Sequence, residues 1–317
     1  DPKIADEFQD ETGIVLASKP FIINNKTKAK TYIADIKRLV KAEAFPPGLL
    51  NASMLVGKFP DPAIRKIVRE ALQKVNFGKA PKGVNYSKTK ANQVFGGNFK
   101  TIKEKATLER VAKFNTDRGK MFDDFWNSIN NIAKSNPKLE GTIRNIVAAS
   151  AYERSHPHAS GAEVVSYDSK GKGKAVWEHA VPSMYAADVL LDAAFNPKAD
   201  FQNVLTNVKK NYKQVAFPEL DAKKIDEGLG ESSKFTMPTV NNKPWNLYND
   251  SWTARYDQIP GLNLKNQKWL VPGTNVFTET LSDGFNQMIE RTKGVKAEAI
   301  YSDTRAKKLG EKRGFQA

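Results

Sequence analysis

The chain has 317 residues and no cysteine, and its 50 Lys and Arg against 35 Asp and Glu give a formal net charge of +15. The lack of cysteine excludes disulfide frameworks, thiol catalysis and Cys-ligated zinc. No apolar run approaches the roughly 18 residues that a membrane-spanning helix needs, and the excess positive charge favours a polyanion such as nucleic acid as the partner.

The N-terminal half is expected to be helical after an extended arm. Residues 1–29 are predicted to form the arm. The helical domain is predicted over residues 30–154, where apolar side chains recur at helical spacing in "KTYIADIKRLVKAEA" and "DPAIRKIVREALQKV". Asp61 is placed to cap the second of these helices, with Pro62 at its first position. Three further helical patterns complete the domain: "TIKEKATLERVAKF", "DRGKMFDDFWNSINNIAKS" and "LEGTIRNIVAASAYERS".

A long basic loop, residues 74–105, is predicted to interrupt this domain, because its glycines break any helical period. The loop contains eight lysines and one acidic residue, Glu104. Its lysines are predicted to bind nucleic acid: Lys74, Lys79, Lys82, Lys88, Lys90, Lys100, Lys103 and Lys105. Four aromatic residues lie among them: Phe77, Tyr86, Phe95 and Phe99.

Lysines spaced by aromatic residues suit a nucleic-acid strand, because the amines neutralise phosphates and the rings can stack on bases. Lysine outnumbers arginine in the loop, so binding is expected to be directed to the backbone and to weaken with salt. Two alternatives are a solvated loop that its aromatic residues anchor to the core, and a loop that contacts an acidic protein.

Residues 155–231 are predicted to form a β-hairpin followed by helices. The segments "AEVVSYD" and "AVWEHAV" are strand-like, and "SKGKGK" between them is a turn. Helices are expected from Pro182 and after a cap at Asp200.

Residues 232–317 are predicted to contain an irregular Trp-rich segment, a helix over about residues 276–291 and a basic tail. The tail adds three residues to the predicted nucleic-acid-binding set: Arg305, Lys307 and Lys308. Taken along its whole length, the pattern predicts a mainly α protein with a small β-hairpin, of the α+β class.

All three histidines lie within one stretch of 24 residues: His156, His158 and His179. The proline inside "HPH" favours an extended path in which the first two imidazoles point the same way, as in metal-binding pairs on strands. A mononuclear metal site completed by Glu163 or Glu178 is one interpretation. The other is a structural His179, hydrogen-bonded near the start of a helix.

The segment "WEHAVP" resembles the core of His-Me finger nucleases of the endonuclease I type. In that family the histidine at the end of a strand activates water, and one divalent cation is held against the scissile phosphate. The resemblance is carried by Glu178, His179 and Pro182, and it implies that His179 is the general base. The family has a second strand where Pro182 starts a helix, and Asn196 and Asn203 do not match the position of its metal ligand.

Two longer segments, "WEHAVPSMYAADVLLDAAF" and "IYSDTRAKKLGEKRGF", resemble stretches of the very large polyproteins of tailed bacteriophages, especially marine ones. The second carries Ser302, Ala306, Gly310 and Gly314 at the spacing of a basic motif that recurs in those proteins. The resemblance implies a protein of the phage particle, assembled in the host cytoplasm. It also implies a product cut from a longer precursor, an expectation with which the missing initiator Met agrees.

Two functional hypotheses follow. The first is a DNA-facing, non-catalytic virion protein without a cofactor. Its partners would be the phosphate backbone of nucleic acid, other virion proteins and further copies of itself in a homo-oligomer. The second is a metal-dependent endonuclease that uses His179 as general base, with Glu178 beside it, and that requires a divalent metal ion.

Overall fold

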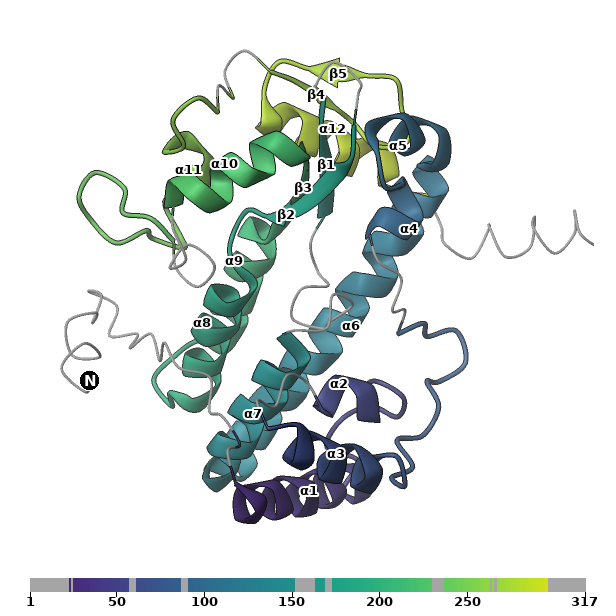
Figure 1. The fold of residues 1–317 in the computed structure, drawn as a ribbon, viewed down its shortest axis with the longest axis vertical. Coiled ribbons are helices and arrows are strands. Elements are labelled where there is room, and N and C mark those ends of the chain that lie inside the picture. Colours follow the sequence, from purple (N-terminus) through teal and green to yellow (C-terminus); the bar gives the residue numbers. More distant parts are fainter. Residues whose placement is uncertain are drawn as a thin grey trace, which may run out of the picture.

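The computed structural model describes residues 23, 25–56, 61–86, 91–151, 163–168, 173–229, 237–262, 264 and 267–295. This part of the chain is mainly helical with one small mixed sheet, which confirms the predicted α+β class. The sheet lies toward one end of the long axis and a group of helices occupies the other end (Figure 1). Among the described residues, no helix combines the length and the apolar character needed to cross a membrane.

The longest helix, α6 (Leu108–Ser135), runs diagonally through the molecule and joins its two ends (Figure 1). Thr107 caps its N-terminus through the side-chain oxygen. Apolar side chains of its first two turns belong to the core beneath the sheet, whereas those from Met121 onward belong to the core of the helical end. The sequence predicted two helices across this region. The chain is helical without a break from Leu108 to Ser135 although residues 115–120 include Asn, Thr, Asp and Gly, because this segment contains no proline and the helix packs into a core on each side of it.

At the helical end, seven elements share one core with the C-terminal half of α6. They are α1 (Lys26–Lys41), α2 (Ala52–Val56), α3 (Pro62–Leu72), the 3₁₀ turn η3 (Pro137–Leu139), α7 (Glu140–Ala151), α8 (Ser183–Phe195) and α9 (Phe201–Asn211). Asp61 caps α3 as predicted, because its carboxylate accepts a hydrogen bond from the backbone nitrogen of Ala63 at 2.7 Å. Helix α1 begins inside the segment predicted as an extended arm, since Asn25 provides the cap.

The sheet has five strands in the order β2–β3–β1–β4–β5. Their bounds are β1 (Glu163–Asp168), β2 (Ala175–His179), β3 (Lys213–Pro218), β4 (Lys268–Leu270) and β5 (Phe277–Thr278). Both predicted strands, β1 and β2, are present. Their expected pairing with each other is corrected, because β3 lies between them, parallel to β1 and antiparallel to β2. The helix predicted after Asp200, "ADFQNVLTNVKKNYKQV", included the first three residues of β3, and the strand was missed.

Helices pack on the sheet from two sides. On one face α12 (Leu281–Thr292) approaches β1 and β4 closely, because Gly284 offers no side chain where Val165 and Trp269 lie. On the other face Phe95, in α4 (Ala91–Phe95), packs its ring 5.3 Å from that of Trp177. The remaining helices at this end are α5 (Phe99–Lys105), α10 (Glu219–Leu229) and α11 (Ala254–Asp257).

The Trp-rich segment is anchored by its tryptophans, as its composition indicates. Trp245 and Trp269 are buried, and the indole nitrogen of Trp245 donates a hydrogen bond to the carbonyl oxygen of Ser251 at 2.9 Å. The segment also contains α11 and β4, which the prediction of an irregular loop did not include.

Candidate nucleic-acid interface

Helix α1 has one apolar face and one strongly basic face. Its apolar side chains, among them Tyr32, Ile36 and Leu39, are buried in the core of the helical end. Five lysines on the rest of its surface are exposed: Lys26, Lys28, Lys30, Lys37 and Lys41. The helix is therefore held in place by its apolar face and presents ammonium groups to solvent.

The one acidic residue of α1, Asp35, pairs with a single exposed cation of this face, Arg38. Asp35 is buried, and its carboxylate accepts a hydrogen bond from the hydroxyl of Thr142 on α7 at 2.6 Å. It also lies 3.5 Å from the guanidinium of Arg38. The carboxylate is thus directed into the core, away from the exposed lysines.

The surrounding surface carries the same sign of charge. We call residues 25–56 and 61–86 the basic lobe, which contains twelve Lys and Arg and four Asp and Glu. Eight exposed basic side chains of the lobe form no ion pair with any described carboxylate: Lys26, Lys30, Lys37, Lys41, Arg69, Lys74, Lys79 and Lys82. These cations are free to meet an external anion.

The predicted basic loop does not form one continuous binding surface. Lys74, Lys79 and Lys82 are exposed on the basic lobe, whereas α5 carries the next described lysines of the loop to the sheet end of the molecule (Figure 1). There the Nζ of Lys100 lies 3.9 Å from the carboxylate of Glu104, and Lys103 lies over the ring of Phe277. Lys105 is exposed at the same end. Only the first part of the loop contributes to the basic lobe.

The aromatic residues of the loop pack inward. Phe95 and Phe99 are fully buried beneath the sheet, and Phe77 and Tyr86 pack partly buried against the core of the helical end. The expectation that Phe95 and Phe99 stack on bases is wrong, because their rings already fill the core. The alternative, in which the aromatic residues anchor the loop, is confirmed for them.

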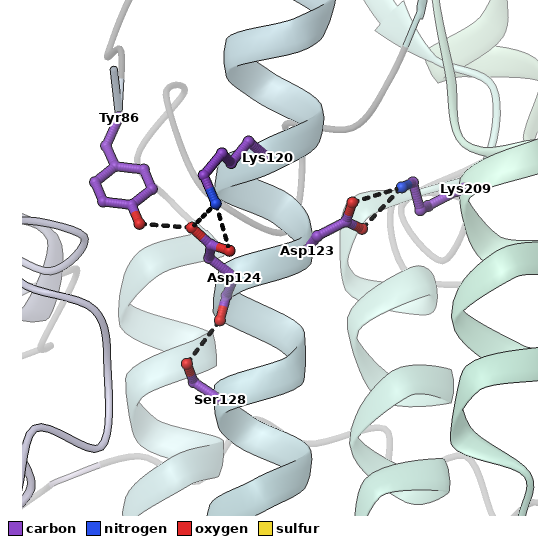
Figure 2. Close-up of polar contacts among 6 residues, drawn as sticks. All are labelled: Tyr86, Lys120, Asp123, Asp124, Ser128 and Lys209. Atoms are coloured by element: carbon purple, nitrogen blue, oxygen red, sulfur yellow. Dashed lines mark hydrogen bonds and ion pairs between the residues drawn. The ribbon is translucent and has the colours of Figure 1, made fainter. Parts of the chain in front are cut away.

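Two neighbouring acidic residues of α6 neutralise charge elsewhere on the molecule (Figure 2). The carboxylate of Asp124 accepts hydrogen bonds from the Tyr86 hydroxyl at 2.5 Å and from Lys120 at 2.9 Å. Asp123 accepts from Lys209 of α9 at 2.8 Å. Lys120 and Lys209 are therefore internally paired, in contrast to the lysines of the basic lobe.

His179, the last residue of β2, is held by Gln214 of β3 and by Tyr212, which directly precedes that strand. Its Nε2 lies 2.9 Å from the amide nitrogen of Gln214, and its ring stacks on Tyr212 with centroids 5.3 Å apart. Burial, and then the charges of Arg255 and Arg118, lower the pKa of His179 to about 4. The imidazole is neutral at pH 7, and with its Nε2 accepting from Gln214 this arrangement favours a structural residue over a general base.

Two buried cations near this histidine were not singled out by the sequence analysis. Arg118 and Arg255 are each 4% exposed, and the charges of both act on His179. The Nη1 of Arg255 donates a hydrogen bond to the carbonyl oxygen of His179 at 2.6 Å. Burial lowers the pKa of Arg118 to about 10. No local sequence pattern could have identified them, because α6 and α11 bring them to His179 from distant positions in the sequence.

The metal interpretation rests partly on residues outside the described part of the chain. His156 and His158 lie there, as do Lys88, Lys90, Arg305, Lys307 and Lys308. Glu178 precedes His179 on β2, where successive side chains point to opposite faces. The described residues contain no cluster of three His, Asp or Glu side chains that could hold a metal ion.

Comparisons with known proteins identify no relative of this chain. No protein-family model matches it, and neither the curated proteins nor the solved structures contain a significant match.

Proposed function

We propose that this protein binds the phosphate backbone of nucleic acid through its basic lobe, as a DNA-facing, non-catalytic component of a tailed-phage particle. The observation that carries the proposal is the surface of α1, where lysines are exposed while the single carboxylate of the helix, Asp35, is bonded to Thr142 in the core. The particle setting comes from the sequence resemblance alone.

The composition of the basic lobe indicates what kind of contact it would make. Seven of its eight exposed, internally unpaired cations are lysines. Lysine carries a point charge, whereas arginine presents the planar fork that reads guanine edges. We therefore expect affinity for the backbone without strong sequence preference.

A charge-neutralising variant tests the proposal. In Lys26→Gln/Lys30→Gln/Lys37→Gln three exposed lysines of α1 become neutral, and helix propensity hardly changes because Gln and Lys are similar helix formers. The matched control is Lys210→Gln/Lys223→Gln/Lys268→Gln, which removes the same charge from exposed positions on α9, α10 and β4.

Binding to a labelled DNA duplex is measured by fluorescence anisotropy at low salt. We expect the α1 variant to lose at least about tenfold in affinity, because each neutralised contact removes one released counterion. The control is expected to bind nearly as the wild type does. Equal losses in the two variants would show that net charge alone drives binding, and would overturn the assignment of the basic lobe.

The particle setting has a separate test. Peptides from residues 25–295 are expected in purified virions of the phage that encodes the chain, at a stoichiometry fixed relative to the capsid protein. Their absence from purified virions would refute the virion assignment and leave the nucleic-acid assignment to its own experiment.

A further inference from the structure

A small cavity opens in the basic lobe where the end of α1 meets the turn after α3. Its volume is about 200 Å³. The residues that line it come from two segments: Val40, Glu43, Phe45, Pro46, Pro47 and Leu50 from the first, and Asn76, Phe77 and Gly78 from the second.

The two walls interlock through their backbones. The nitrogen of Gly48 donates a hydrogen bond to the carbonyl oxygen of Phe77 at 2.7 Å. Gly48 has φ +77°, and a Cβ there would lie 2.5 Å from the nitrogen of Ala80. Gly78 has φ +72°, and a Cβ there would lie 2.8 Å from the Cβ of Pro47. Glycine is required at both positions, so the shape of the cavity is set by the backbone before any ligand arrives.

Two polar groups at this cavity are available to a ligand. The Oδ1 of Asn76 accepts a hydrogen bond from the nitrogen of Gly78 at 3.0 Å, which fixes the amide and leaves its NH₂ as a donor. Neither this NH₂ nor the carboxylate of Glu43 has a partner among the described residues. Glu43 also has φ +50°, a conformation that non-glycine residues seldom adopt. The cavity therefore offers one donor and one acceptor beside apolar walls.

We propose that this cavity binds one unpaired nucleobase of a single-stranded nucleic acid, an inference that rests on the proposed function of the basic lobe. A cavity of about 150 Å³ suffices for benzene, so about 200 Å³ has room for one heteroaromatic ring. Phe45, Phe77 and the two prolines supply the apolar surface, and the amide and carboxylate match the donors and acceptors on a base edge. A base inside a duplex is stacked and paired, so only an unpaired one can enter.

The charges around the cavity support the same ligand. Lys41 and Lys74 lie two residues before Glu43 and Asn76, and Lys79 directly follows Gly78. All three lysines are exposed, so they can neutralise the phosphates on either side of an inserted base. The carboxylate of Glu43 disfavours a phosphate or an acidic side chain inside the cavity itself.

The experiment compares a labelled thymidine oligonucleotide with an abasic oligomer of the same length and charge. The wild-type chain is expected to bind the thymidine strand at least about fivefold more tightly, which corresponds to the stacking of one base. Val40→Trp, which fills the cavity, is expected to abolish this preference. Asn76→Ser, which replaces the amide donor by a shorter hydroxyl, is expected to reduce it. Asn92→Ser, at an exposed position on α4, is the matched control. Circular dichroism verifies that each variant is folded.

The outcomes separate this inference from the proposed function. Salt-dependent binding of both strands with equal affinity would overturn the base pocket and leave backbone binding intact. A thymidine preference that survives in Val40→Trp would overturn the cavity as its source. Failure of the wild type to bind either strand would overturn both proposals.

Discussion

The carboxylate of Asp35 and the hydroxyl of Thr142 are joined by a hydrogen bond of 2.6 Å that links α1 to α7. The bond satisfies a buried acid and, at the same time, removes the only negative charge of α1 from its exposed surface. One interaction therefore stabilises the fold and leaves the lysines of the helix unneutralised.

Replacing Asp35 by Ala is expected to destabilise the protein by about 1–3 kcal/mol, because the buried hydroxyl of Thr142 loses its acceptor. Urea unfolding measures the change, with Asp226→Ala on the exposed surface of α10 as the control, for which less than about 0.5 kcal/mol is expected. Duplex binding by the folded variant should be at least as tight as that of the wild type. Weaker binding would contradict the role given to α1.

The neutral state of His179 makes folding stability depend on pH. Its pKa is lowered from 6.5 to about 4 in the folded chain, so the unfolded chain binds the proton more readily. The stabilisation is complete above pH 6.5 and is lost as the pH falls toward 4, amounting to up to about 3 kcal/mol. His179→Gln removes this titration. The stability difference between wild type and variant should therefore shrink between about pH 7 and pH 4.5, and a constant difference would contradict the buried neutral imidazole.

Arg255 is expected to control this titration. Its charge is one cause of the lowered pKa of His179, and its Nη1 bonds to the carbonyl oxygen of the same residue. Its Nε is buried without a hydrogen-bond partner in the described part of the chain. Arg255→Met should therefore lower the free energy of unfolding by only about 1 kcal/mol. The variant loses the hydrogen bond to the carbonyl oxygen of His179, but it also avoids the cost of burying a charged guanidinium.

The pKa of His179 should rise in this variant, as measured by NMR titration of the ring protons, with the resonance assigned through His179→Gln. An unchanged pKa in Arg255→Met would show that burial alone keeps the imidazole neutral.

Two glycines with similar backbone angles provide a matched test of the cavity walls. Gly48→Ala should destabilise the protein by about 2–5 kcal/mol, because left-handed strain adds to a clash with the backbone of Ala80. Gly83 has φ +84°, and a Cβ there would have no neighbouring atom within 4 Å. Gly83→Ala should then cost only the strain, about 1 kcal/mol. Thermal unfolding measures both changes in stability. Equal losses for Gly48→Ala and Gly83→Ala would mean that the turn at Gly48 does not pack against the backbone of Ala80.

Local signals in the sequence predicted local structure. The cap at Asp61 and Pro62 determined the start of α3, because capping depends only on neighbouring residues. Strand β3 could not be found in this way. The first three residues of β3, "KQV", continue the helical pattern that precedes them. The strand conformation is decided by pairing with β1 and β2, which lie far away in the sequence.

The candidate interface was predicted only in part. The lysine-rich loop was identified, but its division between two ends of the molecule depends on where Phe95 and Phe99 are buried. The lysines of α1 were not among the predicted binding residues, although a helix with six basic residues and one acidic residue is a visible signal. That Asp35 is turned inward follows from a contact with Thr142, which is 107 residues away.

The salt dependence of duplex binding tests the central claim most directly. The logarithm of the association constant, plotted against the logarithm of salt concentration, is expected to be linear in the wild type. The slope should become shallower by up to about 2.7 in Lys26→Gln/Lys30→Gln/Lys37→Gln, because each lost phosphate contact contributes about 0.9. A slope unchanged from that of the wild type would show that the lysines of α1 do not contact phosphate.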